Sequence, residues 1–181
     1  MSAIAQWLSI AGICISLLFT ADISIRKVSS TETPKSNACS GPEYHQFDFW
    51  VGDWDAFEDG SATPDARLHV DRFLDGCVVR EDYQDTNGMK GQSFSLYDSS
   101  RNVWHQTWVT NRGRLLVIEG GFTHEEMVLT GTDLTESGSK RQVRGSWKAV
   151  KGGVRETAVI SLDGGKTWKP WFEILFRPHQ P

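Results

Sequence analysis

The chain lacks an excess of positive charge, and this shortage argues against nucleic acid as a partner. Its 181 residues carry 19 Lys and Arg against 23 Asp and Glu, which gives a formal net charge of -4. Nucleic-acid-binding domains are generally basic, with Lys and Arg gathered into a patch that neutralises phosphates. We therefore expect no nucleic-acid partner.

Metal-ligand spacing is also missing. The 5 histidines stand at positions 45, 69, 105, 124 and 179, so no two lie two or four residues apart, as paired ligands often do. The acidic run "DWDAFEDG" begins like a calcium loop, but Phe57 occupies a ligand position and Pro64 stands where the closing glutamate belongs. No G-x-S-x-G elbow is present either, which disfavours a nucleophilic hydrolase. We expect no metal site.

Long apolar runs are scarce, and the chain has one, "LSIAGICISLLFTA", at 8–21. Its length suits the core of a secretory signal better than a membrane span, which needs about 20 apolar residues. However, no Lys or Arg precedes it, and Phe19 stands where a small residue is preferred before cleavage after Ala21. Two interpretations stay open: a signal peptide over 1–21 of a periplasmic or secreted protein, or an uncleaved anchor over 3–21. In the second case the membrane is contacted through this segment alone.

The rest of the chain divides into a linker and one domain. Residues 22–40 are rich in Ser, Thr, Pro and Lys without periodicity, which is typical of a disordered linker. Residues 41–181 have the length of one domain with one core.

Cysteine is rare, with 3 in the chain, and Cys14 falls in the apolar segment. Cys39 and Cys77 remain, and an even pair in an oxidising compartment favours a disulfide. Such a bond would close a loop of about 38 residues and stabilise the domain by about 3–4 kcal/mol. The alternative is a buried free thiol at Cys77 and an unpaired Cys39.

Helical periodicity is absent from the domain, and alternation takes its place. Ten runs rich in β-branched and aromatic residues are separated by turn sequences such as "TNGMKG" and "DGGK". The runs are 53–59, 66–73, 76–83, 92–98, 103–110, 115–122, 125–132, 141–150, 154–162 and 167–176. Short connections predict antiparallel pairing in sequence order, and closure removes both exposed edges. We expect an all-β domain that forms a ten-stranded antiparallel up-and-down barrel.

A single Asp-box, "SLDGGKTW" at 161–168, lies between the last two predicted strands. In the families that carry this pattern it is a hairpin corner, in which the Ser and Asp cap the backbone of the turn. A sialidase propeller would need several copies and a longer chain. We therefore interpret Asp163 and Trp168 as structural residues.

The segment "GDW" at 52–54, at the start of the first strand, resembles the G-x-W signature of lipocalin-like (calycin) barrels, which include fatty-acid-binding and nitrobindin-type members. The resemblance implies that Gly52 and Trp54 close one end and that Arg177 packs its cation on the Trp54 indole. The blocks "YHQFDFWVGDWDAF", "DGCVV", "WHQTWV", "EGG" and "SLDGGKTW" further resemble a family of exported, mostly uncharacterised bacterial proteins. That resemblance implies the barrel and export, and no reaction.

The interior of such a barrel is the expected binding site, because every second residue of a strand points inward. In the run 103–110, one face carries Trp104, Gln106 and Trp108, and the other carries His105. Aromatic walls with a few polar groups suit a small molecule, although the same aromatics could simply fill the barrel. The ligand-binding candidates are Trp104, Gln106, Trp108, Tyr83, Ser93, Met127, Trp147 and Glu173.

The sequence thus favours an exported barrel that binds a small lipophilic molecule. One alternative is a cofactor-free enzyme, such as an isomerase, cyclase or hydratase, with His105 or Glu81 transferring a proton inside the cavity. Another is a structural envelope module with a filled barrel. No cofactor is expected: haem would need an inward-facing His near the open rim, and His179 follows the last predicted strand.

Overall fold

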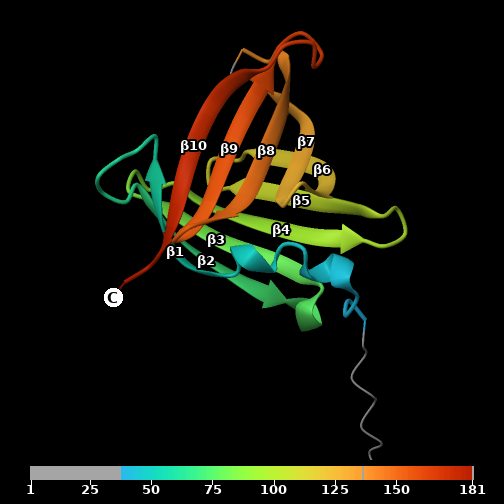
Figure 1. Ribbon diagram of the computed structural model, residues 1–181. Coiled ribbons are helices and arrows are strands. Elements are labelled where there is room, and N and C mark those ends of the chain that lie inside the picture. The colour runs from blue at the N-terminus through green and yellow to red at the C-terminus, as the bar shows by residue number, and fades with distance from the viewer. Residues whose placement is uncertain (1–37, 136, 181) are drawn as a thin grey trace, which may run out of the picture. The chain divides into compact units, whose positions relative to one another are not determined.

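The protein forms a closed barrel of ten antiparallel strands, which confirms the fold expected from the sequence (Figure 1). The computed structural model describes residues 38–135 and 137–180, so the predicted signal or anchor and residues 22–37 of the predicted linker lie outside the described residues. The strands are β1 (Gly52–Glu58), β2 (Ala66–Phe73), β3 (Val78–Asp85), β4 (Lys90–Asp98), β5 (Val103–Thr110), β6 (Leu115–Thr123), β7 (Glu126–Leu134), β8 (Lys140–Val150), β9 (Gly153–Ser161) and β10 (Lys169–Pro178).

Each strand pairs with its neighbours in sequence, and β1 closes the barrel by pairing with β10. The alternation seen in the sequence decides which side chains are inside. In β2, for example, Ala66, Leu68 and Val70 are buried while Arg67 and His69 are exposed. Because the barrel closes, neither β1 nor β10 is left as an exposed edge strand that could pair with another chain.

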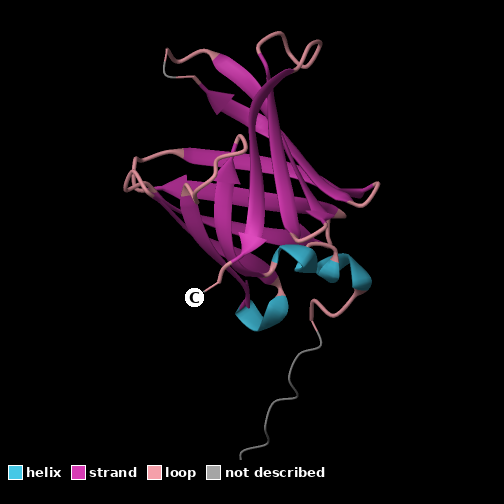
Figure 2. Cartoon of the chain, turned by 60° about the vertical axis from the view of Figure 1, so that its left-hand side comes forward, coloured by secondary structure: helices cyan, strands magenta, loops and turns pink. Residues whose placement is uncertain are grey.

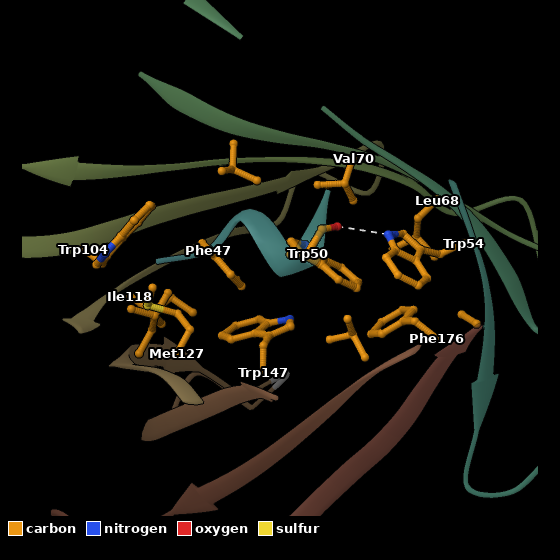
Figure 3. Packing of buried hydrophobic residues seen from close by; sticks show 14 of the residues in the cluster. Phe47, Trp50, Trp54, Leu68, Val70, Trp104, Ile118, Met127, Trp147 and Phe176 are labelled. Atoms are coloured by element: carbon orange, nitrogen blue, oxygen red, sulfur yellow. Dashed lines mark hydrogen bonds between the residues drawn. The ribbon is translucent and has the colours of Figure 1, made fainter. Parts of the chain in front are cut away.

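One end of the barrel is closed by the chain segment that precedes β1. Three short 3₁₀ helices lie at this end: η1 (Pro42–His45), η2 (Asp48–Trp50) and η3 (Leu74–Gly76) (Figure 2). Phe47 and Trp50 insert their side chains into the core and are 0% and 1% exposed (Figure 3). The Trp50 ring lies 4.4 Å from the ring of Phe176 on β10. We call this the closed end.

Trp54 belongs to the closed end, as expected, but its partner is not Arg177. Its indole Nε1 donates a hydrogen bond of 3.0 Å to the Trp50 carbonyl, and the two indoles stack at 5.9 Å. Arg177 lies on the opposite face of β10 from the buried Phe176, so its guanidinium covers the ring of Phe57 at 5.2 Å. The expected Arg177–Trp54 contact is therefore wrong. Gly52 is structural, because a Cβ there would lie 3.0 Å from the Trp54 ring.

A disulfide joins Cys39 to Cys77 and ties the segment before η1 to the residue after η3. The predicted pairing is confirmed. The bond connects the start of the described chain to the closed end of the barrel, and it spans 38 residues of sequence.

The Asp-box forms the β9–β10 hairpin corner, as interpreted from the sequence. Ser161 Oγ donates to Asp163 Oδ1 at 2.7 Å and accepts from the Gly165 amide at 2.8 Å. Asp163 also accepts from the amide and hydroxyl of Thr167, at 2.9 and 2.6 Å. Trp168 Nε1 donates to the Gly165 carbonyl at 3.1 Å. These contacts hold the turn, and the guanidinium of Arg144 lies over the Trp168 ring at 4.1 Å.

Candidate binding site in the barrel interior

The inner face of β5 carries Trp104, Gln106 and Trp108. Gln106 is 4% exposed and donates through Nε2 to Oγ of the buried Ser95 on β4, at 2.9 Å. Trp104 is 1% exposed, and its ring lies 5.8 Å from that of Phe47. The period of two in a strand then places Val103, His105, Thr107 and Val109 on the outer face.

His105 therefore lies outside the barrel, and its assignment as a catalytic group in the cavity is corrected. Its Nδ1 is 2.8 Å from Glu119 Oε1 on β6, and its Nε2 is 2.8 Å from Thr107 Oγ1. Glu119 also accepts two hydrogen bonds from Arg101, at 3.1 and 2.8 Å. The hydrogen bonds from Arg101, which have the larger effect, and from His105 lower the Glu119 pKa to about 2. The group is a surface ion-pair network.

Glu173 also lies outside, so its placement among the interior candidates is wrong. Its neighbour Ile174 pairs with Glu156 of β9 and packs against the core, which turns Glu173 to the opposite face. The Glu173 side chain is 56% exposed and forms an ion pair of 3.5 Å with Arg155.

The remaining interior candidates share the inner face but separate into two groups. Trp104 and Met127 are almost fully buried in the aromatic core at the closed end, where they fill space. The others are Tyr83 on β3, Ser93 on β4, Gln106 and Trp108 on β5, and Trp147 on β8, and two inward-facing glutamates lie on β3 and β9. Their role as ligand contacts stays a prediction.

The two glutamates are Glu81 on β3 and Glu156 on β9. Ser93 Oγ donates to Glu81 Oε2 at 2.8 Å, across the β3–β4 pair. Trp147 is the register partner of Glu156 on β8, and its side chain favours the charged form of the Glu156 carboxyl group, which lowers the Glu156 pKa. Strands far apart in sequence thus place two carboxyl groups inside one barrel.

Both carboxyl groups titrate far from their usual range. Burial raises the pKa of Glu81 to about 7, although the bond from Ser93 opposes the shift. Burial also raises the pKa of Glu156 to about 8, and repulsion from Glu81 adds to the rise. The charge of Glu81 thus reaches Glu156, and protonation of Glu81 favours ionisation of Glu156.

Tyr83 and Trp108 form an aromatic wall inside the barrel. Their rings meet edge to face, with centroids 5.7 Å apart. Gly91 makes the arrangement possible, because a Cβ at this position would lie 2.2 Å from the Trp108 ring. Burial raises the Tyr83 pKa, and the charges of Asp85, Glu58, Glu81 and Glu156 raise it further. The inner site is defined here as Glu81, Tyr83, Ser93, Trp108, Trp147 and Glu156.

The inner site differs from the closed end in being partly accessible, although two of its members, Ser93 and Trp147, are 2% and 4% exposed. Glu81, Tyr83, Trp108 and Glu156 point inward, yet each keeps part of its surface open to solvent. At the closed end, by contrast, Phe47 and Trp50 are at most 1% exposed. The barrel is therefore solidly packed at one end and reached by solvent at the inner site.

A hollow of about 1060 Å³ lies over the outer faces of β1–β5. Its lining includes exposed polar side chains that already pair with each other, such as His69 and Asp53 at 2.8 Å. It is broad and open to solvent, so a bound molecule would stay largely hydrated. The inner site combines aromatic surface, hydrogen-bonding groups and two carboxyl groups that form no ion pair with a described residue. It is the stronger candidate for a binding site.

Glu156 is not among the site residues expected from the sequence, although the alternation pattern of its strand contains a signal for it. In the run 154–160, Val154, Glu156, Ala158 and Ile160 share one face, so a carboxylate interrupts an otherwise apolar row. A charged residue on the buried face of a strand needs a partner or a function. Phe47 and Trp50 were also missed as core residues, because they precede the first strand and have no strand periodicity.

No protein-family model matches the chain, and a search of curated proteins gave no match. Within residues 38–135 and 137–180, no helix combines the length and apolar character needed to span a bilayer. The same residues contain no group of three or more His, Cys, Asp or Glu arranged to hold a metal ion. What the protein does is therefore argued from the barrel and its inner site.

Proposed function

We propose that the protein binds a small, largely apolar molecule inside its barrel, at the inner site. One observation carries the proposal: Trp108, Tyr83 and two glutamates face the barrel interior and still remain partly accessible. Side chains that only filled a core would be closed off, as Phe47 and Trp50 are. Aromatic surface with a few convergent polar groups is typical of small-molecule sites.

Export is part of the proposal. The Cys39–Cys77 disulfide supports it, because such bonds persist in the periplasm and outside the cell and are rare in the cytosol. The apolar run at 8–21 supports it as well. Pulse labelling of the full chain in a bacterial host, followed by fractionation, tests the location. We expect the oxidised protein outside the cytoplasm, and a reduced, cytoplasmic product would contradict export.

Binding is tested with N-phenyl-1-naphthylamine, a neutral apolar fluorophore whose emission rises in apolar surroundings. Trp108→Ala removes the largest aromatic surface of the inner site and should weaken binding by about 10-fold. Trp171→Ala, which removes a 41% exposed indole from β10, is the matched control and should bind as the unaltered protein does. Circular dichroism checks that both variants fold.

The proposal fails if the unaltered protein does not bind the fluorophore. It also fails if Trp108→Ala folds and binds with unchanged affinity, because the molecule would then sit elsewhere.

A cofactor-free isomerase, cyclase or hydratase is the second candidate, and the carboxyl pair favours it. Groups with pKa values of about 7 and about 8 can donate and accept protons near neutral pH. A panel of apolar ketones in D₂O tests this chemistry, with deuterium uptake at the α-carbon measured by mass spectrometry. Uptake above the buffer rate should disappear in Glu81→Gln and persist in Glu173→Gln. No uptake with any ketone that binds would argue against proton abstraction.

A further inference from the structure

The carboxyl groups of the inner site have no cationic partner. Among the described residues, no Lys, Arg or His forms an ion pair with Glu81 or Glu156. The polar side chains beside them are neutral: Ser93 donates a hydrogen bond to Glu81, and Trp147 lies beside Glu156. Burying an acidic pair without a counter-charge is unfavourable, so proteins usually provide an Arg or Lys beside it.

Basic residues near the barrel rims cannot serve this role, because they are already engaged. Arg72 lies 3.0 Å from Asp48 at the closed end. Arg141 lies 2.7 Å from Asp133, on the β7–β8 pair. Glu58 on β1 and Asp85 on β3 add negative charge near Tyr83. The inner site is thus left with an uncompensated negative potential whenever its carboxyl groups ionise.

Two further features of the same space attract positive charge. The rings of Tyr83 and Trp108, both partly accessible, provide aromatic surface, to which organic cations bind. Gln106, 4% exposed and directed inward, uses Nε2 to bond Ser95, while its Oε1 accepts no hydrogen bond from the described residues. This carbonyl oxygen is not among the fully buried atoms that lack a hydrogen-bond partner, so it remains open to a ligand that carries N–H groups.

We propose that the inner site selects apolar molecules bearing a positively charged nitrogen, such as lipophilic amines or quaternary ammonium compounds. The inference rests on the proposed function and names the class of its ligand. A bound cation would supply the counter-charge that the protein itself lacks, and the aromatic rings would hold its apolar part. Apolar acids, including fatty acids, should be rejected, because their carboxylates would meet Glu81 and Glu156.

Three probes of similar size test the selection, each titrated by calorimetry into the unaltered protein at pH 8. They are benzyltrimethylammonium, its uncharged isostere neopentylbenzene, and the anion 3-phenylpropanoate. The dissociation constant of the cation should be at least about 10-fold lower than that of the isostere, and the anion should bind weakest.

A pair of variants then locates the effect. Glu156→Gln removes a charge inside the barrel and should weaken binding of the cation by about 10-fold, while neopentylbenzene binds within about 2-fold of its original affinity. Glu173→Gln removes an equal charge outside the barrel and should leave all three affinities unchanged. If Glu156→Gln fails to fold, the comparison of the three probes in the unaltered protein still decides.

The outcomes separate this inference from the proposed function. If neopentylbenzene or the anion binds at least as tightly as the cation, cation selection is overturned while the binding function stands. If neither these probes nor N-phenyl-1-naphthylamine binds, both proposals are overturned. If the preference for the cation persists in Glu156→Gln but is lost in Glu173→Gln, the cation binds on the outer surface. That result would overturn the inference.

Discussion

At the scale of single residues, the carboxyl groups of Glu81 and Glu156 decide what the barrel can hold. The interior of a barrel normally lacks carboxylates, because an ion loses its hydration there. Ser93 donates a hydrogen bond to Glu81, and the Trp147 side chain favours the charged form of Glu156. These interactions recover part of the lost hydration energy. Protonation recovers more, and it explains why burial raises both pKa values.

The pH dependence of stability follows from these shifts. Each raised pKa means that the folded state holds a proton that the unfolded state has released, so folding is favoured at low pH and loses this advantage as pH rises from about 4.5 through about 8. We expect the free energy of unfolding to fall by about 6 kcal/mol between pH 5 and pH 9, because each unit by which a pKa is raised corresponds to about 1.4 kcal/mol. Urea unfolding of a Glu81→Gln, Glu156→Gln double variant should show little change over that range.

Groups on the outer surface act in the opposite direction at lower pH. Hydrogen bonds lower the pKa values of Asp98 and Glu119 to about 2, so their contribution is present above the usual carboxyl pKa and is lost on acidification. Stability should therefore be highest near pH 5. A stability that rose steadily to pH 9 would contradict the ionisation assigned to the inner site.

At the scale of elements, the closed end depends on the segment before β1. Phe47 lies 5.8 Å from Trp104 and 5.7 Å from Trp147, ring to ring, so one side chain bridges β5 and β8. Trp50 bridges β1 and β10 through Trp54 and Phe176. The segment therefore links opposite walls of the barrel, which explains why it is buried although it belongs to no strand (Figure 3).

Replacing Trp50 tests this role. Trp50→Ala should lower the free energy of unfolding by about 3–5 kcal/mol, because it opens a large cavity among rings that cannot collapse into it. Trp171→Ala removes an exposed indole that packs on Arg141 and should lower it by about 1 kcal/mol or less. Guanidinium unfolding measures both, and equal effects would show that η2 is not part of the core.

At the scale of the whole molecule, the strands and their closure could be predicted because they depend on local patterns. Alternation marks each strand, turn residues mark each hairpin, and short connections leave antiparallel neighbours as the simple solution. The Asp163 corner and the Cys39–Cys77 bond followed from equally local reasoning.

Which face of each strand points inward could be predicted less well. Period two separates His105 from Trp108 but does not say which of them is inside, since both faces of β5 mix polar and apolar residues. The meeting of Glu81 with Glu156 depends on closure of the whole barrel, which brings β3 and β9 to one interior. Arg177 was misplaced for a similar reason: its side follows from the register of β10 against β1, not from its position at the end of the chain.

The most direct test of the account is a crystal structure of the protein with N-phenyl-1-naphthylamine bound. We predict that the molecule lies inside the barrel, against the Trp108 ring and within contact of Glu81 or Glu156. A barrel interior filled by side chains, with the molecule found only in the outer hollow over β1–β5, would contradict the central claim.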